Sequence, residues 1–462
     1  MKTNTSVRSS LALLVALGAY GCASDVVSIG EERTSQLLER GSRCARSVDV
    51  EGDVRIRSQA ELDELSGCEQ IGGDLSIEIF EGTDLSPLSA LRVVGGSLEI
   101  GLPPPFSSEG VETLEELDEL DAEYDAILAR MRAIADAGWL ESLHGVEALE
   151  QVGTLRLVDI SAPDLRAFVS LRNVAAHYRS ANAGIVGMLR MRNLVDLSGL
   201  ENITGVRSLA MQQNPVLESL DGITLGAGLD EVSLGGNPRL YDLDALIPLE
   251  RVQKNFILSG SAARDLDALA NLGYAYGGVE IESNPELVDA TGLNGLVAAD
   301  ELNIERNTAL RRVPEFQALS SIRRIAFEDN PQLETVTIDA LFLTVPLDRV
   351  RNRELPNSAD WLVFAANAGL RSISLPHAFP SARIVAIQDN ASLVSVDLGN
   401  LEQIGELLSI QGNAQLSDVR LGDLRSAAAL EVIDNPQLST ATLGAVPSFD
   451  STFTGNADTP EL

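Results

Sequence analysis

Three glutamates recur at a fixed spacing, and their side chains are the ones that could act together in binding chemistry. Glu282, Glu305 and Glu328 are each separated by 23 residues. If the chain coils with that period, their side chains stand about 5 Å apart on neighbouring strands. Like charges in that position destabilise the pairing of strands. The column therefore needs compensation, either from positive charges of the protein itself or from a ligand.

Two kinds of compensation fit this column. Arg306, Arg323 and Arg324 lie close by in the sequence and can neutralise the column on a solvated face. The alternative is a divalent cation, or a basic partner, docked on the carboxylates. Ca²⁺ takes about six to eight oxygen ligands, so a Ca²⁺ site would also need Asp329 and water. Ca²⁺ is the only cofactor that the sequence suggests, and no other metal is expected.

Catalytic chemistry has little support in the sequence. His144, His177 and His377 lie far apart, and the chain has no H-E-x-x-H, G-x-S-x-G, P-loop or paired C-x-x-C motif. Paired carboxylates could hydrolyse a glycan, but we expect aromatic platforms beside them. Aromatic residues are 4% of the chain, and Trp139 and Trp361 are distant in sequence. We predict no catalytic residue and no enzyme; a solenoid enzyme acting on polysaccharides is the less favoured alternative.

A repeated asparagine shows how the glutamates are positioned. Asn-Pro-x-Leu occurs five times, with related Asn-x-x-Leu copies among them, and most steps are 23 residues. The series is Asn214, Asn237, Asn284, Asn307, Asn330, Asn367, Asn390, Asn413 and Asn435. An apolar pair precedes each asparagine, as Ile325 and Phe327 precede Asn330, and this alternation predicts a short strand with one buried face. Such strands are stable only when they stack coil on coil, so the pattern predicts a solenoid.

The asparagine has a physical role in such a coil. Backbone groups point into the interior, where water cannot reach them, and an unpaired group costs about 1–3 kcal/mol. An Asn side chain carries both a donor and an acceptor, so a column of asparagines can satisfy these groups turn after turn. In one turn Ser261 stands in place of the asparagine. We predict that the nine asparagines form a buried structural ladder.

The N-terminal half also repeats, but with a different motif between and within the strands. Residues 71–77 and 94–100 share an apolar–Gly–x–x–Leu–x–Ile plan, and segments such as Asp196–Ile203 lie between the strands. This alternation resembles the L domains of the insulin and epidermal growth factor receptors and their bacterial relatives, and the second half is similar to leucine-rich repeats. The resemblance covers most of residues 44–440. It implies a right-handed solenoid with parallel sheets and exposed faces suited to recognition, but not hormone binding, because the cysteine-rich modules and the kinase are absent.

The expected fold class is therefore α/β to mostly β, a right-handed leucine-rich-repeat-like solenoid of the receptor L-domain type with parallel sheets. It occupies residues 43–462 in about 15 coils, one of them with a strand centred at Met191. A helical insertion is expected at about 103–138, because apolar residues recur there at spacings of three and four. That helix either packs on the flank of the solenoid or binds a partner. About 14 residues near 341–356 form a second insertion.

The N-terminus indicates export. Lys2 and Arg8 precede an apolar stretch at residues 11–17 that is too short to span a membrane and has the length of a signal-peptide core. Small residues then lead to Cys22. This resembles the lipobox of bacterial lipoproteins, except that Ala19 stands where a leucine is usual; ordinary secretion with cleavage nearby is the alternative.

The lipobox resemblance implies a signal peptide at 1–21, a lipid on Cys22 and a flexible tether at 22–42. Because Ala23 and not aspartate follows the cysteine, it also implies the outer membrane. The formal net charge of −34 repels nucleic acid and anionic lipid surfaces, so nucleic acid is not an expected partner and the membrane contact is the lipid.

Two further cysteines lie at a spacing of about one repeat. Cys44 and Cys68 are 24 residues apart, and adjacent coils would bring their Cα atoms within the roughly 7 Å that a disulfide bridges. An exported location permits their oxidation. We predict a Cys44–Cys68 disulfide, a feature that the L-domain resemblance shares.

Together these features predict a non-catalytic, lipid-anchored cell-envelope protein. Its solenoid surface is expected to bind or adhere to an unknown protein or glycan partner. A structural envelope scaffold without a specific ligand is the alternative.

Overall fold

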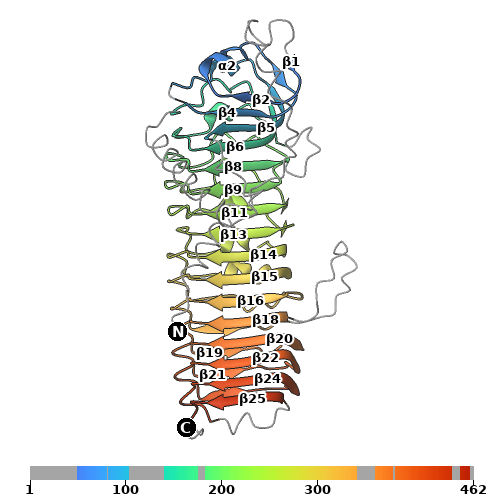
Figure 1. The fold of residues 1–462 in the computed structure, drawn as a ribbon, viewed down its shortest axis with the longest axis vertical. Helices are drawn as coiled ribbons and strands as arrows, with labels where there is room; N and C mark the ends of the chain where they lie inside the picture. Colours follow the sequence, from blue (N-terminus) through green and yellow to red (C-terminus); the bar gives the residue numbers. More distant parts are fainter. Residues whose placement is uncertain are drawn as a thin grey trace, which may run out of the picture. The chain divides into compact units, whose positions relative to one another are not determined.

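The computed structural model describes residues 49–80, 82–102, 140–174, 183–340, 359–377, 380–439 and 448–457. The chain divides into two compact units, residues 1–163 with 167–185 and residues 164–166 with 186–462. Both are built from parallel strands, about one per turn of the chain (Figure 1). The predicted parallel-sheet solenoid is thus confirmed, with about 14 turns in place of about 15.

Unit 1 contains two short parallel ladders joined by long strands. Its strands are β1 (Asp49–Val50), β2 (Val54–Ile56), β3 (Gln70–Ile71), β4 (Leu75–Glu78), β5 (Val93–Gly101), β6 (Gln151–Val158) and β7 (Asn173–Val174). β5 pairs with β3 at Val93 and with β4 at Leu98, and its register with β6 shifts between Val94 and Ser97. The glycines of the repeated Gly-Gly motif lie at this shift.

The Gly-Gly motif is required by a close approach of neighbouring turns. A Cβ atom on Gly95 would lie 2.3 Å from the carbonyl oxygen of Gly72 in the preceding turn. The backbone N–H of Ser97 donates to Asp74 Oδ1 at 2.6 Å, and that of Asp74 donates to Asp53 Oδ1 at 2.8 Å. Aspartate side chains therefore satisfy the backbone where the ladder is interrupted.

The described residues contain almost no helix. The longest helical segments have five residues: α2 (Gln59–Asp63), whose N-cap Ser58 accepts from the Glu61 N–H, and the 3₁₀ turn η6 (Thr291–Gly295). The other 3₁₀ turns are η2 (Ser86–Leu88), η3 (Arg166–Phe168), η4 (Asp244–Leu246) and η5 (Asp267–Leu269). The α/β part of the expected fold class is therefore wrong for these residues, because the connections are too short for a stable helix. The helical insertion expected at 103–138 lies outside the described residues.

Unit 2 has a long parallel sheet, called here the main sheet. Its strands are β8 (Ile185–Leu189, from Val186 on), β9 (Ser208–Gln212), β10 (Gly228–Leu229), β11 (Glu231–Gly235), β12 (Arg251–Val252), β13 (Asn255–Ser259), β14 (Tyr274–Glu282), β15 (Ala298–Glu305), β16 (Arg324–Glu328), β18 (Ala359–Ala365), β20 (Ser381–Gln388), β22 (Gln403–Gln411), β24 (Ser426–Ile433) and β25 (Ser448–Thr454). Matching positions of successive turns pair directly; Ile304, for example, pairs with Ile281 and with Phe327. Alternate residues point inward and are buried, so one continuous apolar core runs behind the sheet.

A second, four-stranded sheet covers the later turns of unit 2. It consists of β17 (Thr335–Thr337), β19 (Ser372–Ser374), β21 (Ser395–Asp397) and β23 (Asp418–Arg420), all parallel. Earlier turns carry η4, η5 and η6 in their corresponding connections. The expected insertion near 341–356 falls between β17 and β18 and lies outside the described residues.

A residue in the left-handed region follows the strand in most turns. The non-glycine examples have φ between 53° and 58°, values that L residues adopt rarely. They are Asp159, Arg190, Gln213, Ser283, Arg306, Asp329, Ala366, Asp389 and Asp434. This conformation turns the chain inward, so that the next residue enters the core of the turn.

The next residue in most turns is the asparagine of the repeat. All nine predicted ladder asparagines are 0% exposed. The Asn330 backbone N–H donates to Asn367 Oδ1 at 3.0 Å, and its side-chain Nδ2 donates to the Ile304 carbonyl at 2.8 Å. Asn330 Oδ1 accepts in turn from the Asn307 N–H at 3.1 Å. Each asparagine thus links three successive turns. We call this arrangement the asparagine column.

Two features of the column differ from the sequence pattern. Met191 holds a column position, because its N–H donates to Asn214 Oδ1 at 2.9 Å, and the strand of that turn is β8. The predicted strand centre at Met191 was wrong because an apolar residue in a column position looks like a strand residue. At the other end, Asn456 extends the column: its Oδ1 accepts from the Asn435 N–H at 3.2 Å.

Asn330→Ala should lower the free energy of unfolding by about 1–3 kcal/mol, because the Asn307 N–H and the Ile304 carbonyl of the preceding turn lose their bonds to the Asn330 side chain. Chemical denaturation monitored by circular dichroism measures the change. Asn271→Ala is the matched control: it removes a single bond, from Nδ2 to the Ile247 carbonyl, at an exposed position. Equal stability loss in the two variants would show that the column is not a special contributor.

Candidate binding face on the main sheet

The outward positions of three neighbouring strands carry the predicted glutamates. Glu282 pairs in register with Glu305, and Glu305 pairs with Glu328. Their side chains are partly exposed on the face opposite the core, on β14, β15 and β16. The structure therefore brings the three carboxylates into one column across adjacent turns.

Arginines of the protein itself compensate this column. Arg306, the left-handed residue directly after β15, donates from Nη2 to Glu282 and places Nη1 3.4 Å from Glu305 Oε2. Arg324 Nη2 lies 3.1 Å from Glu328 Oε1 on the same strand. The arginine alternative is thus the one that the structure shows. No group of three or more His, Cys, Asp or Glu in the described ranges is arranged to hold a metal ion.

Arg323 does not act on the column. It forms ion pairs with Asp300, at 3.0 Å from Nε to Oδ1, and with Glu301. Side-chain hydrogen bonding and the charge of Asp300 raise the pKa of Arg323 despite some desolvation. Of the three arginines predicted to neutralise the column, two do so.

Two more glutamates belong to the same face but were missed by the sequence reasoning. Glu280 and Glu301 occupy outward positions on β14 and β15, and counting every second residue back from Glu282 and Glu305 would have found both. We call the five side chains the acidic band. They are Glu280, Glu282, Glu301, Glu305 and Glu328.

Burial raises the pKa of two members of the acidic band. For Glu305, desolvation is the largest cause and the Glu328 carboxylate adds to it, while Arg306 acts in the opposite direction. For Glu280, desolvation is again the largest cause, and its charged neighbours Glu282, Glu301 and Glu305 all raise the pKa further. Glu280 therefore differs from Glu305 in having no arginine that stabilises its charged form.

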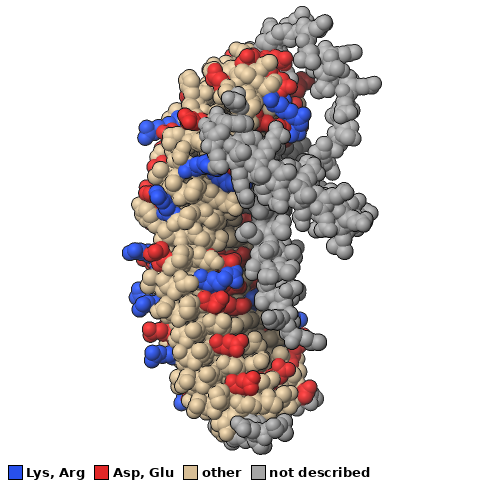
Figure 2. Space-filling view, turned by 60° about the vertical axis from the view of Figure 1, so that its left-hand side comes forward, with Lys and Arg blue, Asp and Glu red and all other residues tan. Residues whose placement is uncertain are grey.

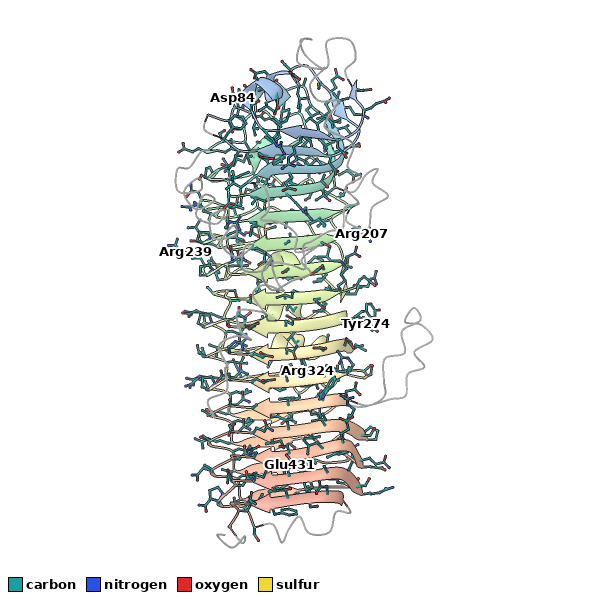
Figure 3. All side chains as sticks on the ribbon, in the orientation of Figure 1. Asp84, Arg207, Arg239, Tyr274, Arg324 and Glu431 are labelled. Carbon is teal, nitrogen blue, oxygen red and sulfur yellow. The ribbon has the colours of Figure 1, made fainter. Side chains whose placement is uncertain are left out.

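Beyond the acidic band the outward face becomes apolar. Trp361 on β18 pairs in register with Ile384 on β20, which pairs with Leu407 on β22; Val363 lies on the same face. All four side chains are partly exposed. We call them the apolar band. Arg324 on β16, which is ion-paired with Glu328 of the acidic band, is the register neighbour of Trp361 on β18, so the two bands adjoin between these strands. Arg324 is labelled in Figure 3, where Glu431 on β24 marks the direction toward the C-terminal turns.

Two arginines of neighbouring turns lie over the Trp361 ring. The guanidinium carbon of Arg383 lies 4.5 Å from the ring centroid and that of Arg323 lies 5.4 Å away. Arg383 Nη1 is also 3.5 Å from Glu406 Oε1. These cation–π contacts leave the indole poorly suited to stack on a sugar ring.

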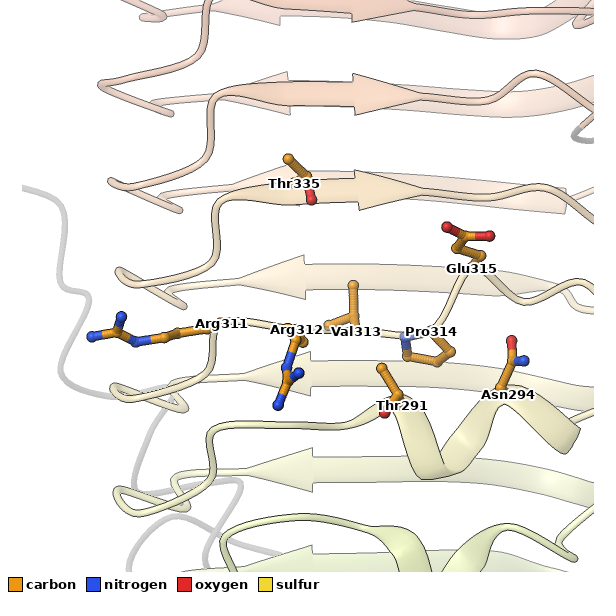
Figure 4. A pocket seen from close by; sticks show the side chains of 8 residues that line it. All are labelled: Thr291, Asn294, Arg311, Arg312, Val313, Pro314, Glu315 and Thr335. Atoms are coloured by element: carbon orange, nitrogen blue, oxygen red, sulfur yellow. The ribbon is translucent and has the colours of Figure 1, made fainter.

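A shallow pocket of about 320 Å³ lies elsewhere on unit 2, beside η6 and β17 (Figure 4). Thr291, Asn294, Arg312 and Thr335 are among its lining residues. Arg312 Nη2 is already 2.7 Å from Asp289 Oδ2. The lining is polar and apolar in about equal parts, contains no aromatic side chain, and offers no group set apart for a ligand.

The described histidines stand in separate carboxylate pairs. His144 Nδ1 lies 2.6 Å from Glu147 Oε1 in unit 1, and His377 Nδ1 lies 2.6 Å from Asp339 Oδ1 in unit 2. The imidazoles of these pairs are largely exposed, so each pair is a solvated ion pair when the histidine is charged. His177 and Trp139 lie outside the described residues.

The predicted cysteine chemistry falls mostly outside the described residues. Cys68 is fully buried in unit 1, whereas Cys22 and Cys44 lie in the segment that is not described. The Cys44–Cys68 disulfide and the lipidation of Cys22 therefore stay predictions.

Charged side chains of both signs are spread over the surface of the molecule, and Figure 2 shows acidic side chains recurring along one of its faces. In the described part of the chain, no helix has the length and apolarity needed to cross a membrane. No family model matches the chain, and no curated protein matches it.

Arg306→Gln should destabilise the fold by about 0.5–1 kcal/mol at pH 8, because Glu282 and Glu305 would then face each other uncompensated; the half-exposed position of Arg306 keeps the effect small. At pH 4 the loss should shrink, since protonation removes the repulsion. Thermal melting at both pH values tests this. Arg311→Gln serves as the control, because Arg311 is exposed and forms no ion pair within the described part of the chain. An Arg306 effect that does not depend on pH would contradict the electrostatic explanation.

Proposed function

We propose that this protein is a non-catalytic, lipid-anchored binding protein of the bacterial cell envelope. In this proposal it binds its partner through the outward face of the main sheet. In this proposal the solenoid is right-handed and of the leucine-rich-repeat, receptor L-domain type. The supporting fold observation is the repetition itself: from β14 to β22 each parallel strand pairs with the next, so their outward residues form one face, although the step from β16 to β18 is longer than the usual 23 residues.

The observation that carries the proposal is the adjacency of two chemically different bands on that face. Five carboxylates stand on β14 to β16, and four partly exposed apolar side chains follow on β18 to β22. Apolar side chains gathered on a sheet face mark an interaction site more often than scattered ones do. Carboxylates beside the apolar side chains favour a partner with basic groups and fix the orientation in which it docks.

The partner that fits is a protein segment carrying basic side chains at one end and apolar side chains at the other. Five strand spacings separate β14 from β22, which is about 24 Å. A helix of roughly 16 residues has that length. The net charge of −34 also attracts a basic segment over a longer range, in a way that salt weakens. The two arginines over the Trp361 ring favour a protein over a glycan.

A designed peptide tests the face directly. A 16-residue helical peptide with lysines in its first half and leucines in its second should bind the purified protein saturably, measured by fluorescence anisotropy. Glu301→Lys and Ile384→Asp should each weaken binding about tenfold, because each places an unfavourable group in one band. Asp423→Lys changes the charge equally but lies on neither band, and should leave the affinity within about twofold.

The outcomes separate the candidate functions. If Asp423→Lys weakens peptide binding as much as Glu301→Lys does, the loss depends only on the net charge of the protein. That result would contradict the proposed binding site. Absence of peptide binding together with saturable binding to a glycan panel would favour a carbohydrate ligand instead. Binding of neither probe would leave the structural envelope scaffold as the better description.

The lipid anchor has its own test. Cys22→Ala should abolish incorporation of a fatty-acid analogue and release the protein from the membrane fraction, because the thiol is the attachment point. Ser24→Ala is a control change beside it that should have neither effect. Unchanged labelling of the Cys22→Ala protein would show that the export segment belongs to an ordinary secreted protein.

A further inference from the structure

Glu280 is the carboxyl group of the acidic band that the protein does not neutralise. Arg306 pairs with Glu282 and Glu305, Arg323 with Glu301, and Arg324 with Glu328. Among the described residues, no hydrogen bond or ion pair reaches Glu280 from any of these arginines. Its side chain is nevertheless largely covered by its neighbours.

A second polar group without a partner lies directly beside it. Asn303 on β15 is the register neighbour of Glu280 on β14. The Asn303 Oδ1 atom is buried and has no hydrogen-bond partner within the described structure. Leaving a buried acceptor unpaired costs about 1–3 kcal/mol, so this atom calls for a donor.

The surroundings fix which way the Asn303 amide points. Its Nδ2 donates to Glu301 Oε2 at 3.4 Å, so turning the amide over would set Oδ1 against a carboxylate. On the other side, its register neighbour on β16 is Ala326, which has no polar side chain. Arg324 lies two residues before Ala326, and its Nε is also buried without a partner in the described structure, so it is the competing donor. Glu280 is the polar side chain directly across from Asn303 in register.

Charged groups face this pair from its own strands and from β16, but not from β13. Glu282 lies on the same strand as Glu280, Glu301 and Glu305 lie on β15, and Arg324 and Glu328 lie on β16. On β13 the register neighbours of Glu280 and Glu282 are Ile257 and Ser259, which carry no charge. The immediate neighbours of Glu280 on both sides are therefore acidic or neutral.

We propose that the protonated Glu280 carboxyl group donates a hydrogen bond to Asn303 Oδ1 across the β14–β15 register. The proton moves from Glu280 to solvent when the group ionises, and the hydrogen bond is lost with it. The raised pKa of Glu280, caused by burial and by three neighbouring carboxylates, acts in the same direction. The pair is thus a pH-sensitive element within the proposed binding face.

Two consequences follow from proton linkage. Because the folded state holds the proton more tightly than the unfolded chain, stability falls as the pH rises from the ordinary pKa of glutamate to the raised one of Glu280. The regulatory consequence rests on the proposed function: a basic segment docked on the acidic band favours the ionised form. Its binding should therefore release a proton and tighten as the pH rises.

Substitution and melting test the pair without any partner. Glu280→Gln keeps a donor for Asn303 Oδ1 and removes the charge, so its melting temperature should exceed that of the wild type at pH 8 and match it at pH 4. Glu78→Gln in unit 1 is the control. Arg55 and Arg57 form ion pairs with the Glu78 carboxylate, so removal of this charge should bring no gain in melting temperature at pH 8.

Carbon-13 NMR of the labelled glutamate carboxyl groups then identifies the hydrogen bond. The signal that disappears in Glu280→Gln should titrate at higher pH than the bulk of the glutamates, and Asn303→Leu should shift that titration to lower pH. If the donor to Asn303 is Arg324 instead, Asn303→Leu will leave the Glu280 titration unchanged. That result, or a titration at the ordinary position, overturns the proposal.

Calorimetry with the lysine–leucine peptide separates this inference from the proposed function. Titrations at one pH in two buffers of different ionisation enthalpy should show a proton released on binding to the wild type and fewer released by Glu280→Gln. Equal proton release in both proteins overturns the regulatory role of the pair. An elevated, Asn303-dependent titration of Glu280 in a protein that does not bind the peptide would leave the pair standing and remove the proposed function.

Discussion

The need to satisfy backbone groups inside a narrow turn is the constraint on which unit 2 depends. The asparagine column meets this need with a single residue type, since one side chain accepts from the turn before, donates to a strand carbonyl and receives support from the turn after. Asn330 shows all three roles, through Asn307, Ile304 and Asn367. The column also sets the register of the main sheet, because each asparagine is hydrogen-bonded to the matching position of the next turn.

Register in turn determines the chemistry of the outward face. Successive residues of a strand point to opposite faces, so packing the inward residues into the core also fixes the positions of the outward ones. Outward side chains one repeat apart therefore become neighbours even when they carry like charges. Glu282, Glu305 and Glu328 are brought together in this way. The left-handed residue after the strand then has a second use: Arg306 occupies that corner and reaches back over the two carboxylates beside it.

The sequence predicted what is periodic and failed where periodicity ends. Strand spacing, the asparagine column and the glutamate column depend on residues at constant intervals, and all three could be read from residue types alone. Met191 was misplaced because its apolar side chain hides a column position, and Asn456 was missed because its step is 21 residues. The boundary between the two compact units has no periodic signal at all.

The special status of Glu280 could not be predicted from sequence either. Its outward position follows from counting, but its lack of a partner depends on where three arginines direct their guanidinium groups. Arg323 illustrates the difficulty: its neighbour Arg324 serves the acidic band at Glu328, while Arg323 itself pairs with Asp300 and contacts Trp361. Side-chain direction, and with it desolvation, is a property of the packed structure.

The step from Asn330 to Asn367 spans 37 residues, yet the hydrogen bonds across it are as long as those across the 23-residue steps. The hydrogen bonds of the asparagine column therefore do not depend on the number of residues between successive turns. Closing a longer connection adds little to the entropy cost of folding. For a lineage of such proteins, the corner between β17 and β18 is a place where new sequence can be acquired without refolding the rest. For a protein engineer, the same corner is a natural site for grafting a peptide epitope or a small domain.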